Sequence, residues 1–433
     1  MVVLPRLALV AALLSPVVLL FDSTPWTALL GVGMVVFMLW LVDWIMAPRP
    51  SRIGVARALP TSITLGRVGT VGWLVANDSG QTARIRFAEG LAPSLHATTR
   101  RADLTLPTGR SAHVETDLHP ERRGRFALGE LVVRTDGPLR FAGRQQTRWI
   151  PAEIRVLPRF PSRAEAELRI RKNRMDIGTR TARVHGRGSE FDQLRDFTID
   201  DEFRKIDWAA TARTGRTIVK TYRAERNQTV INILDNGRLM AGQVAGAPRI
   251  EYAMDAIMAV TTLATRLGDR AGLLAFDNDV RVVVPASNRA TQLGVVTDAM
   301  FDLEPQFAES DYRGAFTDTL VRFSRRTMLI IHTELLEQTV GEFLLPALPL
   351  LTRSHLVVVA SVRDPLVETW ANDIPQTGEE VYRHTAARDA IAERDRTTAL
   401  LRRAGATVVD APPGKLAGRL MDAYLEVKAT GRL

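Results

Sequence analysis

Residues 229–240 read TVINILDNGRLM, and this stretch decides the fold of the second half of the chain. The apolar, β-branched run 230–234 predicts a strand that is buried on both faces, as in a parallel sheet covered by helices. An acid, Asp235, follows directly at its carboxyl end. Ligands of open α/β sheets bind beyond the carboxyl ends of strands, so Asp235 marks a candidate site.

Further apolar runs alternate with amphipathic stretches toward the C-terminus. This alternation predicts a largely parallel sheet with helices on both faces, a doubly wound, Rossmann-type α/β domain over residues 229–433. The expected strands are 271–276, 281–285 at an edge, 327–332, 355–361 and 407–410, and the expected helices are 249–267, 291–301, 313–324, 382–403 and 416–428.

A different pattern precedes residue 160. Apolar and polar residues alternate in short runs such as TVGWLV at 70–75 and ARIRF at 83–87, and turn residues separate the runs. Strands at intervals of about ten residues predict an all-β, sandwich-like domain over residues 48–160. Its histidines are scattered through strand and turn sequence, which does not predict a metal site: His96, His113 and His119.

Residues 1–47 predict a membrane anchor. Residues 7–21 and 26–46 are apolar with few exceptions, and a spanning helix needs about 20 apolar residues. Arginines flank the pair and its turn has none, so the positive-inside rule predicts a two-helix transmembrane hairpin with both ends in the cytoplasm. The protein is then a multi-pass protein of the bacterial inner membrane with a cytosolic soluble part. A cleaved signal peptide is the alternative, and Asp43 is expected to reach the membrane interface.

The amino-acid composition excludes several kinds of site and favours certain partners. The chain has no Cys, which excludes disulfides, thiolate catalysis and Cys-ligated metals. Its net charge is +9, and residues 47–150 carry 16 Arg against 8 acidic residues. An Arg-rich helix expected at 162–175 is interpreted as a solvated linker face. Its nearness to the anchor also permits contact with anionic lipid headgroups. Aromatic stacking platforms are few and no nucleic-acid motif is present, so we expect no nucleic-acid partner.

Residues 186–213 carry a distinctive series of motifs. A Gly-x-Gly-x-Glu-Phe motif is followed by Leu-Arg-x-Phe and then by Arg-x-Ile-Asp-Trp, at intervals that amphipathicity alone does not produce. This stretch resembles the signature of a bacterial family of membrane-anchored proteins called domain of unknown function 58 (DUF58), and the resemblance extends over nearly the whole chain. The signature positions are Gly186, Gly188, Glu190, Phe191, Leu194, Arg195, Asp201, Arg204, Asp207, Trp208 and Arg213.

The resemblance implies a von Willebrand factor A-like fold for the C-terminal domain. It also implies a protein partner, a MoxR-type AAA+ ATPase, because family members are usually encoded beside such enzymes. It names no reaction, since the biochemical activity of the family is not established.

Acidic and basic residues are interleaved in the signature, which belongs to a charged bridge predicted over residues 161–228. Arg204 and Asp207 are three residues apart and would share a face of a helix, so we expect them to pair. One interpretation is an ion-pair network that docks the bridge onto the first strand of the α/β domain. The alternatives are a partner-docking surface, and a carboxylate metal site formed by Glu190, Asp201 and Asp207.

The resemblance to von Willebrand factor A domains implies positions for a metal ion. Metal-binding members carry Asp-x-Ser-x-Ser after the first strand, but here Gly237 and Leu239 follow Asp235 in place of the serines. The later hydroxyl and acid of that site correspond to Ser310 and Glu334. With two hydroxyl ligands missing, octahedral Mg²⁺ coordination is hard to build, so we expect a degenerate, metal-free site. The neighbouring residue Arg238 could receive a partner's carboxylate instead.

Together these observations predict a membrane-tethered cytosolic adaptor or assembly protein that binds protein partners, needs no cofactor and is not an enzyme. The first alternative is a metal-dependent hydrolase or nuclease that uses the clustered carboxylates. The second is a binder of lipid or nucleic-acid surfaces that uses the basic β-domain.

Overall fold

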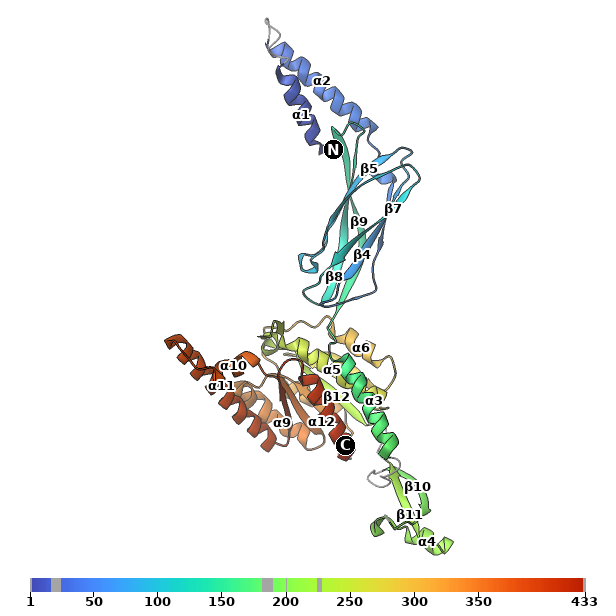
Figure 1. Ribbon diagram of the computed structural model, residues 1–433, viewed down its shortest axis with the longest axis vertical. Coiled ribbons are helices and arrows are strands. Elements are labelled where there is room, and N and C mark those ends of the chain that lie inside the picture. The colour runs from blue at the N-terminus through green and yellow to red at the C-terminus, as the bar shows by residue number, and fades with distance from the viewer. Residues whose placement is uncertain (1, 17–24, 181–189, 200, 224–227, 431–433) are drawn as a thin grey trace. The chain divides into compact units, whose positions relative to one another are not determined.

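The computed structural model describes the chain except for residues 1, 17–24, 181–189, 200, 224–227 and 431–433. The chain forms two compact units, Met1–Leu157 and Pro158–Leu433 (Figure 1).

Two sheets share one core in the first unit. Residues that alternate along the strands point inward, and Trp73 and Phe87 from the two sheets lie with their ring centres 5.3 Å apart. All neighbouring strands pair antiparallel except β3 with β9. One sheet has the order β1 (Val2–Val3), β9 (Ala142–Leu157), β8 (Gly124–Asp136), β5 (Ala83–Glu89) and β6 (Arg101–Leu106), with β3 (Ile63–Thr64) beside β9, and the other has β2 (Ile53–Ala58), β4 (Gly69–Asn77) and β7 (Ser111–Leu118).

One helix of the described residues is long and apolar enough to cross a membrane. Helix α2 (Pro25–Met46) has 22 residues, and only 6% of its most apolar window is buried. Helix α1 (Pro5–Leu14) has 10 residues, which is short of the roughly 20 that a span needs. The predicted multi-pass hairpin is therefore supported for its second helix only, and residues 17–24 between the helices lie outside the described part.

Asp43 lies near the end of α2, and its side chain is fully buried against the β-domain. Its carboxylate accepts hydrogen bonds from the backbone N–H groups of Leu139, Phe141 and Ala142 at 2.7, 2.7 and 2.8 Å. Leu139 and Phe141 lie between β8 and β9, and Ala142 begins β9. In the same turn, a Cβ on Gly137 would approach the Asp43 carboxylate to 2.4 Å. The acid therefore fastens the end of α2 to the β-domain.

A six-stranded sheet is the centre of the second unit. Strand β16 is antiparallel to its neighbour, and the other strands are parallel. Counted along the chain, the order is 3-2-1-4-5-6, that of a doubly wound sheet with its switch point between β12 and β17. The predicted α/β sheet domain is present. The order is β16 (Val280–Ser287), β15 (Arg270–Phe276), β12 (Thr229–Asp235), β17 (Met328–His332), β18 (Leu356–Val362) and β19 (Thr407–Ala411).

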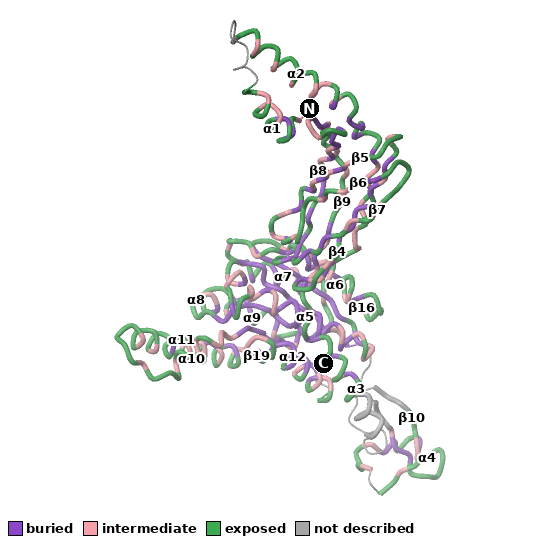
Figure 2. The backbone as a smooth tube through the Cα atoms, turned by 45° about the horizontal axis from the view of Figure 1, so that its top comes forward, coloured by how far each residue is buried: buried purple, intermediate pink, exposed green. Residues whose placement is uncertain are grey.

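Helices cover both faces of this sheet, and its central strands are buried whereas the edge strand β16 is largely not (Figure 2). The side chains of β12 pack on both faces of the sheet, because Val230 belongs to one apolar cluster and Ile231 and Ile233 belong to another. The first cluster includes residues of α3 (Arg163–Arg180), α5 (Arg249–Arg266) and α12 (Leu416–Thr430), and the second includes residues of α7 (Tyr312–Arg322), α9 (Leu345–Thr352) and α11 (Gly378–Arg403). Helix α6 (Gln292–Met300) packs in a third cluster with α5.

Two helical segments were not predicted. The first runs from α8 (Glu337–Thr339) through the π-helical turn η6 (Val340–Leu344) into α9. Its prolines obscure the helical pattern, but Pro346 lies in the first turn of α9, where a missing N–H costs little. The second is α10 (Pro365–Asn372), which precedes α11.

The predicted bridge has two parts. Helix α3 packs on the α/β core through Ala166 and Ile170. The rest forms a small element that we call the signature hairpin: β10 (Glu190–Asp196), η4 (Phe203–Lys205), α4 (Trp208–Thr214) and β11 (Ile218–Arg223). Among the side chains of this element that the structure describes, the buried ones are Ile206, Ala210, Ile218 and Val219.

Candidate functional site

The carboxylate of Asp235 lies at the switch point and has a donor for each of its lone pairs. Asp235 ends β12 and is 1% exposed. Its Oδ1 accepts hydrogen bonds from the backbone N–H of Gly237 at 2.8 Å and the hydroxyl of Ser310 at 2.5 Å. Its Oδ2 accepts from the hydroxyls of Tyr312 and Thr333, each at 2.7 Å. An ionised carboxylate has about four acceptor sites, so no strong site is left for a cation.

Tyr312 is a site residue that the sequence analysis missed. It opens α7, is 2% exposed, and packs against the rings of Phe276 and Phe316 at 5.4 and 6.1 Å. Burial, followed by the negative charge of Asp235, raises the pKa of the Tyr312 hydroxyl well above its usual value. The hydroxyl therefore remains a hydrogen-bond donor. The nearness of Tyr312 to Ser310 in sequence was the available signal.

The position of the Ser310 hydroxyl leaves no room for a side chain at Gly237. A Cβ at position 237 would lie 2.1 Å from Ser310 Oγ and 3.1 Å from Asp235 Oδ1. A serine there, as in a metal-binding site, would collide with the group that now binds the acid. Leu239 lies half-buried in the turn η5 (Arg238–Ala241). The residues present therefore do not fit an octahedral Mg²⁺ ion.

Glu334, the acid expected to complete an ion site, has other partners. Its carboxylate forms ion pairs with Arg249 at 2.9 Å and Arg394 at 2.5 Å, and it accepts a hydrogen bond from Ser361 at 3.1 Å. Arg394 also binds both carboxylate oxygens of Asp410 at 2.8 Å. Burial alone would lower the pKa of Arg394, but its bonds to Asp410 and the charge of Glu334 raise it. This is a closed charge network around the buried carboxylate of Glu334.

Among the described residues, no three His, Asp or Glu side chains come together as metal ligands. A cavity of about 340 Å³ lies between β16 and α7. Its arginines already bind acids: Arg281 pairs with Asp277 at 2.8 Å, and Arg322 with Asp318 at 2.6 Å. Asp279 and Asp311, the N-cap of α7, also line it.

The signature residues separate into structural and exposed ones. Arg195 holds Asp201 through two hydrogen bonds of 2.8 and 2.6 Å, and the backbone N–H and hydroxyl of Thr198 also donate to Asp201. The Arg195 guanidinium is the main cause that lowers the pKa of Asp201 to about 2. Of the remaining signature positions that the structure describes, Leu194, Arg204, Trp208 and Arg213 are exposed.

The predicted pair between Arg204 and Asp207 is wrong. Asp207 caps α4 by accepting the backbone N–H groups of Ala209 and Ala210, and its ion pair is with Lys220 at 3.1 Å. Arg204 lies in the separate turn η4, so the two do not share a helix face.

The hypothetical metal site of Glu190, Asp201 and Asp207 gains no support, because both aspartates have the partners given above. The side chains of Glu190 and Phe191 and the whole of Gly186 and Gly188 lie outside the described residues.

A comparison with known protein families shows which family this chain belongs to. The family described as "Protein of unknown function DUF58" matches residues 193–410, half of the chain. This chain belongs to the DUF58 family.

Similarity beyond the family is distant. The conserved hypothetical protein BatB from Bacteroides thetaiotaomicron is 14% identical, with a TM-score of 0.32, covering 47% of the DUF58 chain and 99% of BatB. A CARDB domain from Pyrococcus furiosus, solved in complex with di-metal ions, is 9% identical, with a TM-score of 0.20, covering 26% and 91% of the two chains. A comparison with curated proteins found no match.

The first prediction concerns metal binding by the DUF58 chain. We expect millimolar Mg²⁺ or Mn²⁺ to leave its melting temperature unchanged, because the acceptor sites of Asp235 are filled and a ligand of the native state must raise stability. Differential scanning calorimetry of the detergent-solubilised protein tests this. A saturable rise that disappears in Asp235→Ala would contradict it.

The second prediction separates the two residues that were expected to pair. Asp207→Ala removes the cap of α4 and strands Lys220, so we expect faster hydrogen exchange at Ala209 and Ala210. Arg204→Ala is the matched control and should leave this exchange unchanged, because Arg204 does not contact Asp207. Equal effects of the two substitutions would restore the pairing hypothesis.

Proposed function

We propose that this DUF58 protein is a membrane-tethered adaptor or assembly protein with a non-catalytic, metal-free, von Willebrand factor A-like domain. The observation that carries the proposal is the Asp235 carboxylate, which accepts four hydrogen bonds from its own chain. A site for a cation or a reacting group would need some of these acceptor positions. The end of the sheet at the switch point is therefore better suited to contact than to chemistry.

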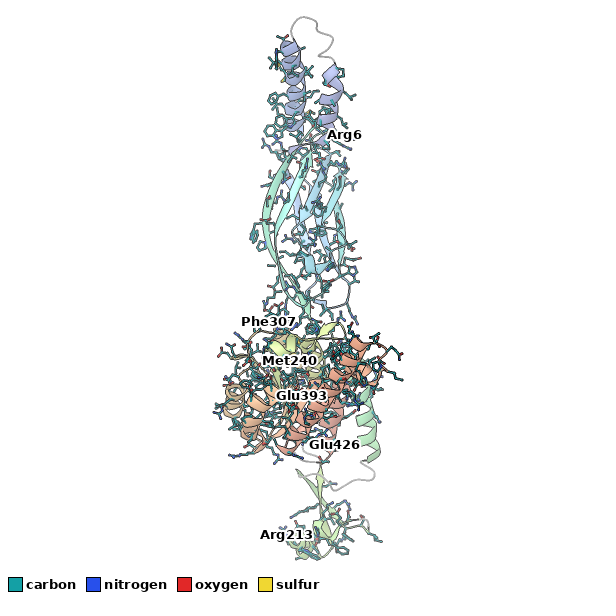
Figure 3. The ribbon with its side chains drawn as sticks, turned by 90° about the vertical axis from the view of Figure 1, so that its left-hand side faces the viewer. Arg6, Arg213, Met240, Phe307, Glu393 and Glu426 are labelled. Carbon is teal, nitrogen blue, oxygen red and sulfur yellow. The ribbon has the colours of Figure 1, made fainter. Side chains whose placement is uncertain are left out.

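The surface around this end has the character of a binding site. Phe307 is 92% exposed, and its loop is held by hydrogen bonds from Gln306 N to Asn236 O and from Arg238 N to Ala308 O (Figure 3). Beside it, Arg238 forms an exposed ion pair with Glu309 at 3.0 Å. Exposed aromatic and arginine residues are enriched where binding energy concentrates. A partner's carboxylate could replace Glu309 on Arg238.

A small cavity of about 20 Å³ lies at the same place, lined in part by Arg238, Tyr312 and Phe343. It has room for about one water molecule rather than a substrate. This supports a flat contact surface at the switch point.

The partner that we propose is a MoxR-type AAA+ ATPase, on the strength of the family resemblance. Co-purification of the full-length protein with this ATPase from detergent-solubilised membranes tests the proposal. Arg238→Glu combined with Phe307→Ala should reduce the recovered ATPase at least about tenfold. Val321→Ala is the control, because Val321 is 77% exposed on α7. Unchanged recovery with the double variant would contradict the assignment of this surface.

The third prediction concerns the orientation of the proposed membrane anchor. Helix α2 exposes its apolar residues, and Asp43 fastens its end to the β-domain. Basic residues follow α2, so we expect residue 433 in the cytoplasm. A C-terminal fusion to green fluorescent protein should fluoresce, and one to alkaline phosphatase should be inactive. Strong phosphatase activity would contradict this orientation.

A further inference from the structure

Helix α2 determines where the β-domain meets the membrane in an anchored chain. A helix rises about 1.5 Å per residue, so the 22 residues of α2 span about 33 Å, close to the roughly 30 Å of a hydrocarbon core. Asp43 lies one turn before the end of α2, and its carboxylate holds the backbone of the turn between β8 and β9 (Figure 1). This turn therefore lies at the level of the lipid headgroups, where α2 leaves the hydrocarbon core.

Further contacts fix other parts of the β-domain to the same end of α2. The side chain of Gln81 donates a hydrogen bond to the carbonyl of Met46 at 2.8 Å. Arg144 donates to the carbonyl of Trp44 at 3.1 Å and lies over its indole ring, 4.5 Å from the centroid. These contacts and the strand pairing bring together five segments that we call the anchor end of the β-domain: 2–6, 43–53, 77–86, 103–110 and 134–145.

Positive charge predominates at the anchor end. Its five segments contain nine arginines and four aspartates, and no Lys or Glu. Two of the aspartates are neutralised within the end, since Asp103 pairs with Arg84 at 2.6 Å and Asp136 pairs with Arg86 at 2.5 Å. The anchor end therefore carries an excess of guanidinium groups over carboxylates.

Four of these arginines form no ion pair with any described carboxylate: Arg6, Arg49, Arg140 and Arg144. Arg6 and Arg49 are exposed, and the other two are partly exposed. Arg6 follows β1, beside the turn, because the N–H of Leu4 donates to the carbonyl of Phe141 at 3.0 Å (Figure 3). The four guanidinium groups are available to bind an anion.

Apolar side chains accompany the arginines. Leu139, next to Arg140 in the turn, is 45% exposed although Asp43 holds its backbone N–H. Trp44 is partly exposed under the guanidinium of Arg144. Tryptophan is enriched at the headgroup level of membranes. A fixed turn that exposes a leucine between basic groups suits the boundary between headgroups and acyl chains.

We propose that the anchor end of the β-domain is a docking surface for anionic phospholipids. Leu139 inserts into the membrane interface beside Trp44, and lipid phosphates are bound by four arginines: Arg6, Arg49, Arg140 and Arg144. The occupant follows from α2, whose exposed apolar residues require a bilayer at this end. Guanidinium groups bind phosphate oxygens in bidentate geometry, and four to eight basic residues beside a membrane helix are typical of binding to anionic lipid.

This lipid-binding role rests on the proposed function, because only an anchored chain holds the β-domain at a membrane. The two can fail separately. Release of the full-length protein from membranes by alkaline extraction would contradict the anchor. Arg140 and Arg144 lie 94 and 98 positions after Met46, the last residue of α2. This is too far along the chain for a topology signal, so replacing them changes the lipid contact and leaves the anchor in place.

The first test measures insertion of the turn with the full-length protein in phosphatidylcholine nanodiscs. Because the chain has no Cys, Leu139→Cys carries a single nitrobenzoxadiazole label. The matched control is Val68→Cys, an aliphatic residue that is 57% exposed before β4, at the opposite end of the same strands. We expect lipids with a nitroxide near the headgroup to quench the label at position 139 and not the label at position 68.

The second test measures selection of negative charge at position 139. The nitroxide is placed on phosphatidylglycerol or on phosphatidylcholine, and we expect half-maximal quenching at a lower mole fraction of the labelled phosphatidylglycerol. A basic residue near an anionic surface contributes about 1 kcal/mol, or about fivefold. Arg140→Gln should reduce the preference about fivefold, and Arg140→Gln with Arg144→Gln should reduce it further. Arg67→Gln with Arg100→Gln removes the same charge at the opposite end and should leave the preference unchanged.

Hydrogen exchange at Phe141 and Ala142 verifies that the turn remains bound to Asp43 in each variant. Three results overturn the proposal: equal quenching by the two lipids, quenching at position 68 as strong as at position 139, and a full preference in the double variant with the turn intact. Absence of quenching at position 139 in protein that resists alkaline extraction also overturns it, and leaves the anchor standing.

Discussion

Replacing Glu334 by Ala lowers the free energy of unfolding of the α/β unit by about 3–5 kcal/mol, the range expected when one partner of a buried ion pair is removed. Glu334 is 8% exposed and lies between Arg249 and Arg394. Without it, two guanidinium groups lose their carboxylate, and Asp410 neutralises only one of them. The substitution therefore leaves positive charge uncompensated at the carboxyl ends of β17 and β18.

Glu337→Ala is the matched control for this prediction. Glu337 lies three residues further along the chain and pairs with Arg396 at 3.6 Å, with both side chains largely exposed. Removing an exposed pair costs about 0–1 kcal/mol. Urea unfolding of the full-length protein, followed by hydrogen exchange in β17 and β18, compares the two variants. Similar small effects would mean that the Glu334 network contributes little to stability.

Asp235→Ala is expected to destabilise the same unit by about 3–5 kcal/mol in the absence of any metal ion. The hydroxyls of Ser310, Tyr312 and Thr333 and the N–H of Gly237 all lose their acceptor. Each buried donor left without a partner costs about 1–3 kcal/mol. Tyr312 and Thr333 keep their mutual contact of 2.8 Å, which limits the total.

Whether Asp235→Ala lowers or raises the stability of the metal-free protein distinguishes a structural acid from an ion ligand. A buried carboxylate that awaits a cation is a charge without compensation, so its removal would stabilise the metal-free protein. Asp235→Asn should fall between wild type and Ala, because the amide oxygen keeps part of the acceptor capacity. Thermal unfolding in the presence of a chelator measures all three proteins. An Ala variant more stable than wild type would contradict our account and restore the ion-site hypothesis.

Local patterns in the sequence determined most elements of the α/β unit, with α8, α9 and α10 as the exceptions. Strand β12 was predicted because its apolar run has the length and composition of a strand covered on both faces. The candidate site followed from the position of Asp235 at the end of that strand. The long apolar helix α2 was also predicted from sequence, since its length and lack of charge are local properties.

The partners of each acid were decided only by the tertiary structure. Asp235 receives its hydroxyl donors from residues 75, 77 and 98 positions away along the chain. Asp43 binds backbone groups 96 to 99 positions away. No periodicity in the sequence encodes which distant donor an acid will meet, because that depends on the order of strands and on how the loops at the sheet edge fold.

In the signature hairpin, too, the sequence predicted the charged residues and the tertiary structure decided their partners, although these partners lie close together in the chain. The interleaved charges indicated ion pairs, but spacing alone assigned Asp207 to Arg204, on the assumption of one continuous helix. The chain instead breaks into η4 and α4, so Asp207 becomes a helix cap and pairs with Lys220 across the element. Sequence thus determined which residues carry charge, but it did not predict the strands β10 and β11. Tertiary structure decided which charges neutralise one another, because ion pairing depends on distances in space that the folded backbone sets.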